Sequence, residues 1–380
     1  MAGIYIHIPF CKRRCTYCDF YSVVNTAYAD RYVDAIIGEL SIRKNEISLD
    51  DVRTIYIGGG TPSVLTADQL GQLLAGIKKM VDFNRVLEVT IEVNPDDVTE
   101  EYMYNVKQCG VNRVSIGIQS FVDSELKAVN RRHNAQGAVE AVARIKRAGI
   151  DNISIDLIYG LPEQTIDTWR HSIDCAIGLG VNHISAYCLS YEEGTALTKL
   201  RDMGKIREAD DDMCVMMYDE LCSRLSTAGY DHYEISNFAL PEMYSKHNSS
   251  YWNGSPYLGL GAAAHSYDGM VRRYNPQNIK QYLDDIEQGI AAFEEEQELW
   301  WQRYNETVMV RLRTRWGVSL SEITREYGDA MAKRFAEISQ QFVLLSMMER
   351  DGDDIYRLTR GGVMMSDAII RELMYVEDGD

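Results

Sequence analysis

The stretch Cys11-Lys12-Arg13-Arg14-Cys15-Thr16-Tyr17-Cys18 directly follows Ile4–Ile8, where apolar residues alternate with others as in a β-strand. Its C-x3-C-x2-C spacing places three thiolates on one short loop, which can hold three corners of a cubane iron–sulfur cluster and leave the fourth iron open. The residues alone also allow a zinc site with His7 or Asp19 as the fourth ligand. Structural zinc sites usually draw ligands from two separated pairs, and the sequence has no second CxxC and no HxxxH, so the spacing favours the cluster.

Outward from this loop, the first half of the chain alternates β-rich runs with longer amphipathic runs. We expect strands at Ile4–Ile8, Thr54–Ile57, Leu87–Val93, Asn112–Ile118, Asn152–Ile158 and Asn182–Leu189. We expect helices between them at Ala29–Lys44, Ala67–Met80, Glu100–Cys109, Ala135–Ala148 and Thr165–Leu179. Strand-plus-helix units in succession imply right-handed crossovers and a parallel sheet, either open and doubly wound or a complete or partial β/α barrel.

The positions of the chemically unusual residues favour the barrel. They follow nearly every predicted strand: the three cysteines, Gly58-Gly59-Gly60-Thr61-Pro62, Glu92, Gln119, Asp156 and Tyr187. In β/α barrels ligand chemistry gathers at the carboxyl ends of the strands, whereas a Rossmann sheet concentrates it at one switch point. The sequence therefore predicts an α/β protein with a partial (β/α)6 barrel.

After about residue 200 the alternation ends. Residues 208–228 have the pattern of a helix, and residues 229–275 form a loop-rich stretch with many Tyr, Asn, Ser and Gly. An acidic helix should follow and end in Glu294-Glu295-Glu296, most simply as a solvated face.

The last part of the chain predicts a small, mainly helical domain. From Trp300 we expect a helix, a turn at Gly317, two short helices, a strand at Asp353–Leu358 and a last helix from Gly361, an order that resembles a winged helix. Residues 300–380 hold 11 Lys/Arg and 14 Asp/Glu, so the expected role is packing or covering and not DNA binding. The predicted domains are a barrel with the cluster loop at 1–230, a connecting segment at 231–299 and the winged-helix-like domain at 300–380.

The composition excludes several classes of function. The 380 residues carry a net charge of −18, which disfavours binding to nucleic acids and to anionic membranes. No apolar run approaches the ~20 residues of a membrane-spanning helix, and the N-terminus lacks the features of a signal peptide. We therefore expect a protein of the reducing cytoplasm, whose cysteines are thiols or metal ligands. Outside the cluster loop, the expected small buried thiols are Cys109, Cys175, Cys188, Cys214 and Cys222.

The cluster loop resembles that of the radical S-adenosylmethionine (SAM) superfamily, whose members bind a [4Fe–4S] cluster on this loop of a partial β/α barrel. The motif Tyr5-Ile6-His7-Ile8-Pro9-Phe10-Cys11, followed by Cys15 and Cys18-Asp19-Phe20, is most similar to the branch of oxygen-independent coproporphyrinogen III oxidase (HemN) and the related haem chaperones. The resemblance implies that Cys11, Cys15 and Cys18 hold the cluster. It also implies that SAM chelates the open iron, where the superfamily cleaves it to a 5′-deoxyadenosyl radical.

The resemblance further implies a set of SAM-binding residues on several strands. They are Tyr5, Tyr17, Gly58, Gly59, Gly60, Thr61, Glu92, Gln119, Arg131 and Asp156. From the residues alone, glycines at 58–60 let the backbone approach a ligand closely because they have no Cβ. For Glu92 and Asp156 the alternative is a salt bridge inside the barrel mouth, since a carboxylate in a strand is costly unless it is paired.

A second motif, His247-Asn248-Ser249-Ser250-Tyr251-Trp252, resembles the HNxxYW motif of the haem chaperone branch and implies that His247 binds haem. A histidine beside Tyr and Trp offers an axial nitrogen and a flat aromatic surface for a macrocycle. The alternative is a structural turn with a hydrogen-bonded histidine. His265 is the next candidate for the ligand, and Arg272 and Arg273 are candidates for contacts to the haem propionates.

Two functions are compatible with this pattern: a carrier that delivers haem to acceptor proteins, and an enzyme that oxidatively decarboxylates coproporphyrinogen III by hydrogen-atom abstraction. Phe20 stands where the oxidases have a fourth cysteine, and Cys11 is not preceded by their longer N-terminal extension. Both departures favour the carrier, with a [4Fe–4S] cluster, SAM and haem bound and no conversion of coproporphyrinogen III. The expected partners are haem-acceptor proteins, with a membrane-protein acceptor and a homodimer as further candidates.

Overall fold

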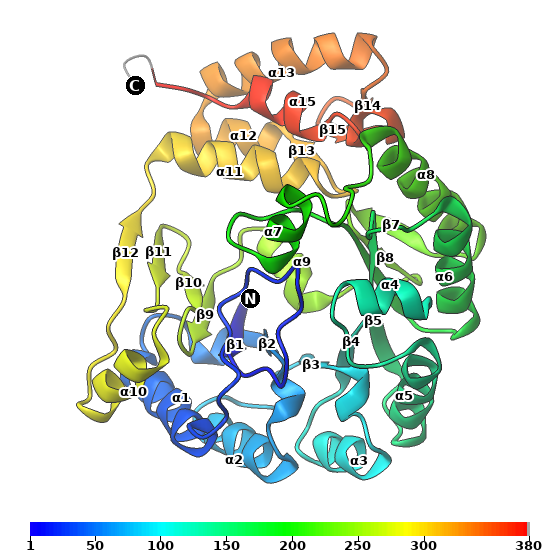
Figure 1. Ribbon diagram of the computed structural model, residues 1–380. Coiled ribbons are helices and arrows are strands. Elements are labelled where there is room, and N and C mark those ends of the chain that lie inside the picture. Colours follow the sequence, from blue (N-terminus) through cyan, green and yellow to red (C-terminus); the bar gives the residue numbers. More distant parts are fainter. Residues whose placement is uncertain (378–380) are drawn as a thin grey trace.

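A curved parallel sheet forms the centre of the molecule, which the computed structural model describes over residues 1–377 (Figure 1). Its strands are β1 (Ala2–Ile8), β2 (Val52–Gly59), β3 (Glu88–Val93), β4 (Arg113–Gln119), β5 (Asn152–Tyr159) and β6 (His183–Cys188). They lie side by side in chain order, and every neighbouring pair among them is parallel. This arrangement confirms the predicted partial (β/α)6 barrel, with strand ends close to those expected.

Helices cover the outer face of the curved sheet (Figure 1). They are α1 (Ala29–Arg43), α2 (Ala67–Lys78), α3 (Glu100–Gln108), α5 (Ala135–Arg147), α6 (Ile166–Gly178) and α8 (Asp211–Thr227). Two short helices, α4 (Asp123–Ala128) and α7 (Ala196–Asp202), belong to the connections after β4 and β6, and the N–H of Leu197 in α7 donates to the carbonyl of Thr16 in the cluster loop. Helix α2 illustrates why they form: Thr66 and Gln69 make a capping box at its start. Its buried residues recur at the spacing of one helix face: Leu70, Leu73, Leu74 and Ile77. Within residues 1–377, no helix has the length and apolar character needed to cross a membrane.

The sheet continues at both edges into the segment that we expected to be rich in loops. Beyond β1 lie β9 (Tyr257–Leu260), which is parallel to it, and then the antiparallel β10 (His265–Tyr267), β11 (Val271–Tyr274) and β12 (Glu294–Gln297). Beyond β6 lie β8 (Asn237–Ala239) and β7 (Asp231–Glu234), and α9 (Lys246–Trp252) connects the two edges. The prediction of a loop-rich stretch at 229–275 did not include these short strands, because they are specified by pairing partners far away in the chain.

The acidic triplet Glu294–Glu296 lies in strand β12 and not at the end of a helix. The helix expected there is α10 (Ile279–Glu287), which ends shortly before Gly289. Pairing with β11 places Glu295 2.9 Å from Arg273 and Glu296 2.8 Å from the hydroxyl of Tyr274. These cross-strand contacts offset the low strand propensity of glutamate, and the side chains stay exposed as expected.

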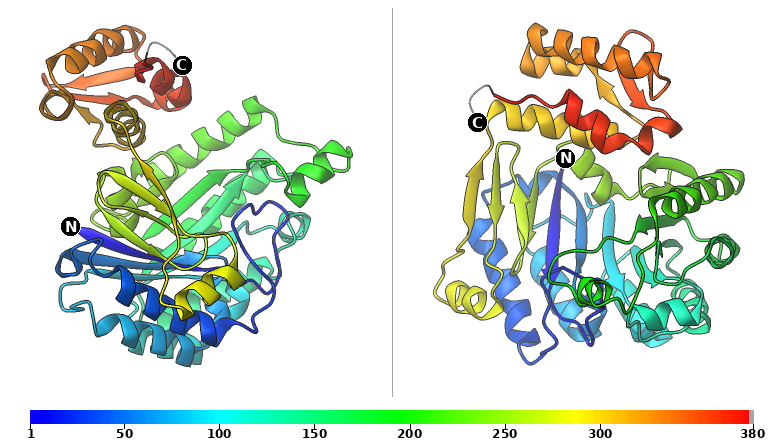
Figure 2. Two further views of the ribbon diagram at one scale, coloured as in Figure 1. Left: turned by 90° about the vertical axis from the view of Figure 1, so that its left-hand side faces the viewer. Right: turned by 45° about the horizontal axis from the view of Figure 1, so that its top comes forward.

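The C-terminal part has a hydrophobic core of its own and stands at one end of the sheet (Figure 2). Its elements are α11 (Trp300–Leu312), β13 (Val318–Ser319), α12 (Leu320–Tyr327), α13 (Asp329–Leu344), β14 (Met348–Asp351), β15 (Ile355–Leu358), α14 (Arg360–Val363) and α15 (Ser366–Leu373). The order resembles that expected for a winged-helix-like domain, with three differences. Helix α13 has 16 residues and is not short, the strands β13 and β14 were not expected, and the last helix is divided into α14 and α15. The exact domain limits at 230 and 299 stay a prediction.

Candidate cofactor site

A cavity of about 510 Å³ opens at the carboxyl ends of the parallel strands. The predicted site residues that line it are Cys11, Cys15, Tyr17, Cys18, Gly59, Gly60, Thr61, Glu92, Gln119, Arg131 and Asp156. The lining does not include Tyr5, Gly58 or His247. Residues from many strands and the cluster loop therefore meet in one place, as the barrel interpretation requires.

The cluster loop is held against the end of β1 by its own backbone. The N–H of Val23 donates to the carbonyl of Pro9 at 2.7 Å, and the N–H of Cys11 donates to the carbonyl of Val23 at 3.0 Å. The buried Sγ of Cys11 lies 3.4 Å from Oγ1 of Thr61, in the loop after β2. The loop is thereby fixed at both the first strand and the second.

The three thiols of the loop face the same cavity and suit a cluster. Nη1 of Arg131 lies 3.5 Å from Sγ of Cys15, where a guanidinium stabilises thiolate charge. Burial raises the pKa of Cys18 to about 11, so a bound metal has to displace its proton. Within residues 1–377, no group of three or more His, Cys, Asp or Glu is arranged as a single metal ion requires. In a cubane each thiolate binds a different iron, so three separate sulfurs on one loop fit that group.

His7 is not placed as a fourth zinc ligand. Its Nδ1 lies 3.0 Å from the hydroxyl of Tyr5, and its Nε2 lies 3.0 Å from the carbonyl of Tyr21. Tyr5 thus orients His7 and is not among the residues that line the cavity, and its contact to SAM stays a prediction. Asp19, the other zinc candidate, does line the cavity.

The glycine loop after β2 packs closely against β1. Gly59 has a φ of +104°, and a Cβ there would lie 2.4 Å from the ring of His7. A Cβ on Gly60 would lie 2.8 Å from the carbonyl oxygen of Ile8. Glycine is therefore required for this approach, which brings the backbone of 59–61 to the cavity wall beside Cys11.

Two carboxylates face the cavity, and neither forms the salt bridge considered from the sequence. Glu92 accepts hydrogen bonds from Tyr56 and from the N–H of Gly59, and burial together with the charge of Asp156 raises its pKa to about 7. Asp156 lies 3.4 Å from the hydroxyl of Ser115, and burial raises its pKa to about 6. Carboxylates whose pKa values are raised in a cavity are candidates for binding a charged ligand.

Strand β4 ends in an unusual backbone conformation at the cavity. Gln119 is buried with a φ of +71°, and the pairing with β5 shifts register between Gly117 and Gln119. Nη2 of Arg131 donates to the carbonyl of Gly117 and, at 3.0 Å, to Asn94. Positive φ in a residue other than glycine costs free energy and tends to occur at functional sites.

Several residues of the cavity lining were not identified from the sequence. They include Asn94, Ser115, Gly117 and Cys188. Ser115 and Gly117 could have been found, because side chains in a strand alternate and both share the face of Gln119. Cys188 was expected to be buried but is exposed, and of the five other thiols only Cys222 is buried.

The HNxxYW motif does not present its histidine at a surface. His247 is fully buried, with Nδ1 2.8 Å from the hydroxyl of Thr54 and Nε2 2.9 Å from that of Tyr251. Its ring also stacks on Tyr56 at 5.2 Å between centroids. In this structure both ring nitrogens are hydrogen-bonded within the chain, and the role of His247 as an axial haem ligand stays a prediction.

The other residues suggested for haem binding make contacts within the chain. Arg272 pairs with Glu298 at 2.6 Å and with Glu306, and Arg273 pairs with Asp268 and Glu295, each at 2.9 Å. His265 is exposed and packs edge-on against Tyr274. Both arginines are therefore ion-paired in this structure, and their contact to haem propionates stays a prediction.

Comparison with known proteins identifies relatives of the chain over its whole length. Residues 5–176 match the Radical SAM superfamily, and residues 301–365 match the HemN C-terminal domain. The chain is 33% identical to the heme chaperone HemW of Bacillus subtilis (strain 168), over 97% of this chain and 98% of that protein. It is 32% identical to heme chaperone HemW of Mycobacterium tuberculosis (strain ATCC 25618 / H37Rv), over 98% of this chain and 94% of that protein.

A solved structure shares the fold. Coproporphyrinogen III oxidase (HemN) from Escherichia coli superimposes with a TM-score of 0.83, covering 98% of this chain and 90% of that chain. The two sequences are 23% identical, so this likeness bears on the fold alone. It extends through both the parallel sheet and the C-terminal part.

Proposed function

The chain belongs to the radical SAM superfamily and, within it, to the family of the haem chaperone HemW, and on this premise we propose that it binds haem and delivers it to acceptor proteins. The cavity at the strand ends supports the proposal that the chain keeps the cofactor site of a radical SAM protein, because three thiols, two carboxylates and Arg131 line it together. The haem part is supported by full-length similarity to proteins named as haem chaperones. The same proposal includes haem-acceptor proteins as partners, among them a membrane protein. It also includes assembly as a homodimer.

We propose that Cys11, Cys15 and Cys18 hold a [4Fe–4S] cluster whose fourth iron is open to SAM. When bound, the cluster and SAM supply one-electron chemistry. The chain's own residues then have simple roles. Ionised Glu92 and Asp156 attract the positive charge of SAM, and the backbone of Gly59 and Gly60 lets it approach the loop without a Cβ in the way.

Conversion of coproporphyrinogen III is not part of the proposal. Phe20, where the oxidases have their fourth cysteine, is 63% exposed at the cavity lining and supplies no thiol there. Radical chemistry on a large substrate needs tight positioning, since a misplacement of about 1 Å can cost about 100-fold in rate.

One anaerobic sample tests both functions. The full chain is reconstituted with iron and sulfide, and then haemin binding is measured by absorbance titration while coproporphyrinogen III consumption is measured with SAM and a reductant. We expect stoichiometric haem binding, transfer of haem to an apo-haem protein and no product with vinyl groups. Formation of protoporphyrinogen over many turnovers would show that the chain acts as the oxidase and not as the carrier. Absence of haem binding would contradict the carrier function.

A further inference from the structure

A buried carboxylate beside the cofactor cavity joins three segments that are far apart in the sequence. Asp97 ends the short turn Pro95–Asp97 after β3, and its side chain is 2% exposed. Its Oδ1 accepts hydrogen bonds from Nζ of Lys12 at 2.7 Å and from Nη2 of Arg132 at 3.1 Å. Its Oδ2 accepts one from the hydroxyl of Ser63 at 3.1 Å. These partners offset the cost of burying a charge.

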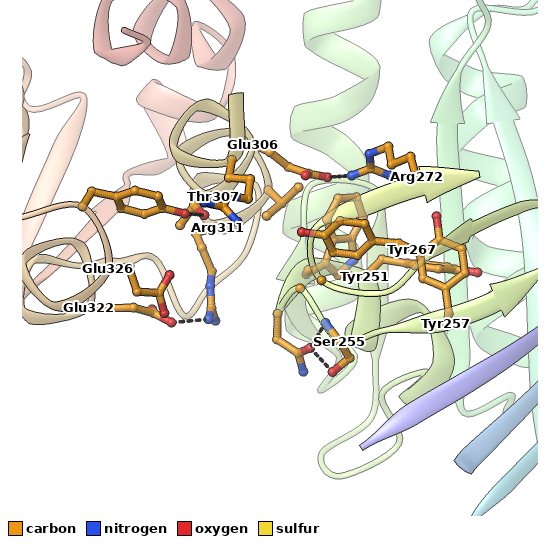
Figure 3. A pocket seen from close by; sticks show the side chains of 17 residues that line it. Tyr251, Ser255, Tyr257, Tyr267, Arg272, Glu306, Thr307, Arg311, Glu322 and Glu326 are labelled. Carbon is orange, nitrogen blue, oxygen red and sulfur yellow. Dashed lines mark hydrogen bonds and ion pairs between the residues drawn. The ribbon is translucent and has the colours of Figure 1, made fainter. Parts of the chain in front are cut away.

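The ion pairs at the boundary of the C-terminal part are simpler. A cavity of about 720 Å³ lies there, between that part and the sheet (Figure 3). In it Arg272 of β11 pairs with Glu306 of α11, and Arg311 of α11 pairs with Glu322 of α12, so each of these pairs joins two elements. Asp97 instead connects the cluster loop, the turn after the glycine loop and the segment after α4, so its loss would release all three.

Two of these partners stand beside the residues that face the cluster thiols. Lys12 directly follows Cys11 in the cluster loop. Arg132 directly follows Arg131, whose Nη1 lies 3.5 Å from Sγ of Cys15. The buried carboxylate therefore restrains the backbone next to the first thiol and next to the guanidinium at the second.

A second route leads from Asp97 to the same guanidinium. The hydroxyl of Ser63 accepts from the N–H of Asn94 at 3.1 Å while it donates to Asp97. The side-chain oxygen of Asn94 accepts from Nη2 of Arg131 at 3.0 Å. Arg131 is thus held through Asn94 and through its neighbour Arg132, and a connected polar network of this kind makes the groups that it joins more rigid.

Asp97 also balances charge beside the cluster loop. Lys12 and Arg132 are cations, and the carboxylate forms an ion pair with each. The reduction potential of an iron–sulfur cluster depends on the charge and the hydrogen bonds around it. A cation left without its carboxylate attracts the added electron and raises the potential. A carboxylate left without its cation repels the electron and lowers the potential.

We propose that Asp97 is a positioning residue for the iron–sulfur cluster, which holds the cluster loop and the Arg131–Arg132 segment in place and balances the charge of Lys12. The inference rests on the proposed function, because it requires the cluster at the three thiols of the loop. Asp97 is not among the residues that line the cavity, so it acts through its partners.

Two substitutions at one ion pair test this role in the full chain, with the cluster reconstituted anaerobically. Asp97→Asn removes the carboxylate charge, and Lys12→Met removes the cation and keeps an apolar stem. Both should speed the loss of iron to the chelator bathophenanthroline disulfonate by roughly tenfold to a hundredfold, as for other groups that orient metal ligands. The reduction potential, measured by a titration followed by electron paramagnetic resonance, should rise in Asp97→Asn and fall in Lys12→Met. A general loss of structure would instead shift both potentials in the same direction.

Matched controls make the same changes at ion pairs away from the site. Asp219→Asn breaks a 2.7 Å pair with Arg360, and Lys333→Met breaks a 3.8 Å pair with Glu337. Neither position lines the cofactor cavity, so both variants should match the parent in iron release and in reduction potential.

Iron release at the parent's rate in Asp97→Asn and Lys12→Met would overturn the inference, and so would potentials that shift in the same direction. If Asp97→Asn does not fold, Lys12→Met decides alone, because Lys12 is half exposed and its loss leaves the buried carboxylate with Ser63 and Arg132. A release rate and a potential like those of the parent in Lys12→Met would then overturn the inference. A parent chain that takes up no cluster would instead overturn the proposed function.

Discussion

The hydroxyl of Tyr56 donates a 2.7 Å hydrogen bond to Oε1 of Glu92 at the cavity that we assign to SAM. The N–H of Gly59 donates to the other carboxylate oxygen at 3.1 Å. Both bonds favour the ionised form, but burial and the nearby charge of Asp156 outweigh them and raise the pKa of Glu92 to about 7. Glu92 therefore titrates near neutral pH, and a cationic ligand should bind the ionised form.

SAM affinity should accordingly rise with pH between about 6 and about 8, because the sulfonium cation is attracted to ionised Glu92. Glu92→Gln should weaken binding by roughly tenfold to a hundredfold at high pH and remove most of this dependence. Anaerobic calorimetry at several pH values measures it, with Glu101→Gln on the exposed side of α3 as the control. An unchanged pH profile in Glu92→Gln would contradict this role for the carboxylate.

The same carboxylates should make the ligand-free chain less stable at high pH. Their pKa values are raised from 4.5 and 3.8 to about 7 for Glu92 and about 6 for Asp156. The two carboxyl groups contribute fully to the free energy of unfolding below their unfolded-state pKa values of 4.5 and 3.8. This contribution is lost as the pH rises through their folded-state pKa values of about 7 and about 6. Glu92→Gln and Asp156→Asn should therefore stabilise the free chain at about pH 8 by roughly 1 kcal/mol while weakening SAM binding. Urea unfolding at acid and alkaline pH checks the sign, and destabilisation by both variants at alkaline pH would contradict it.

The cluster should contain about four irons per chain and require all three thiols of its loop. Replacing Cys11, Cys15 or Cys18 by serine removes the ligand of one iron, so each single variant should lose most of its iron and sulfide. Cys109→Ser and Cys175→Ser are controls outside the cavity and should keep both. Iron and acid-labile sulfide assays on anaerobic samples measure this. Stoichiometric zinc without sulfide in the parent would contradict the cluster.

Features that depend on nearby residues could be predicted from the sequence. The strand before Cys11 and the strands that contain Glu92 and Asp156 show local periodicity, and a parallel sheet brings their carboxyl ends to one edge whatever the details of packing. That is why the cluster loop, Glu92 and Asp156 line one cavity as expected.

Features that depend on distant partners could not be predicted. The hydrogen bond between Thr54 and His247 joins positions 193 residues apart, and that between Glu88 and the N–H of His247 spans 159 residues. The residues next to the motif in the sequence do not predict that this histidine is buried among β-strands. Glu294–Glu296 likewise form a strand only because β11 supplies Arg273 and Tyr274 across from them.

We expect replacement of His247 to lower the free energy of unfolding, whatever its effect on haem binding. Burial lowers its pKa from 6.5 to about 3, so the imidazole stays neutral in the folded chain. Its contribution to the free energy of unfolding is present above about pH 6.5 and should be lost as the pH falls toward about 3. His247→Ala leaves a cavity and two buried hydroxyls, of Thr54 and Tyr251, without this partner, which should cost about 2–4 kcal/mol at neutral pH.

Tyr251→Phe separates the two roles of this histidine, because it removes only the bond to Nε2 and should cost about 1 kcal/mol. Chemical unfolding of both variants, with haemin titration of the folded samples, gives stability and binding on the same preparation. His247→Ala should unfold at lower denaturant, and haemin titration of its folded fraction separates lost stability from lost haem binding. If His247→Ala kept the parent's stability and lost the haem Soret signature entirely, the imidazole would be the axial ligand, and helix α9 would have to open before haem could reach it.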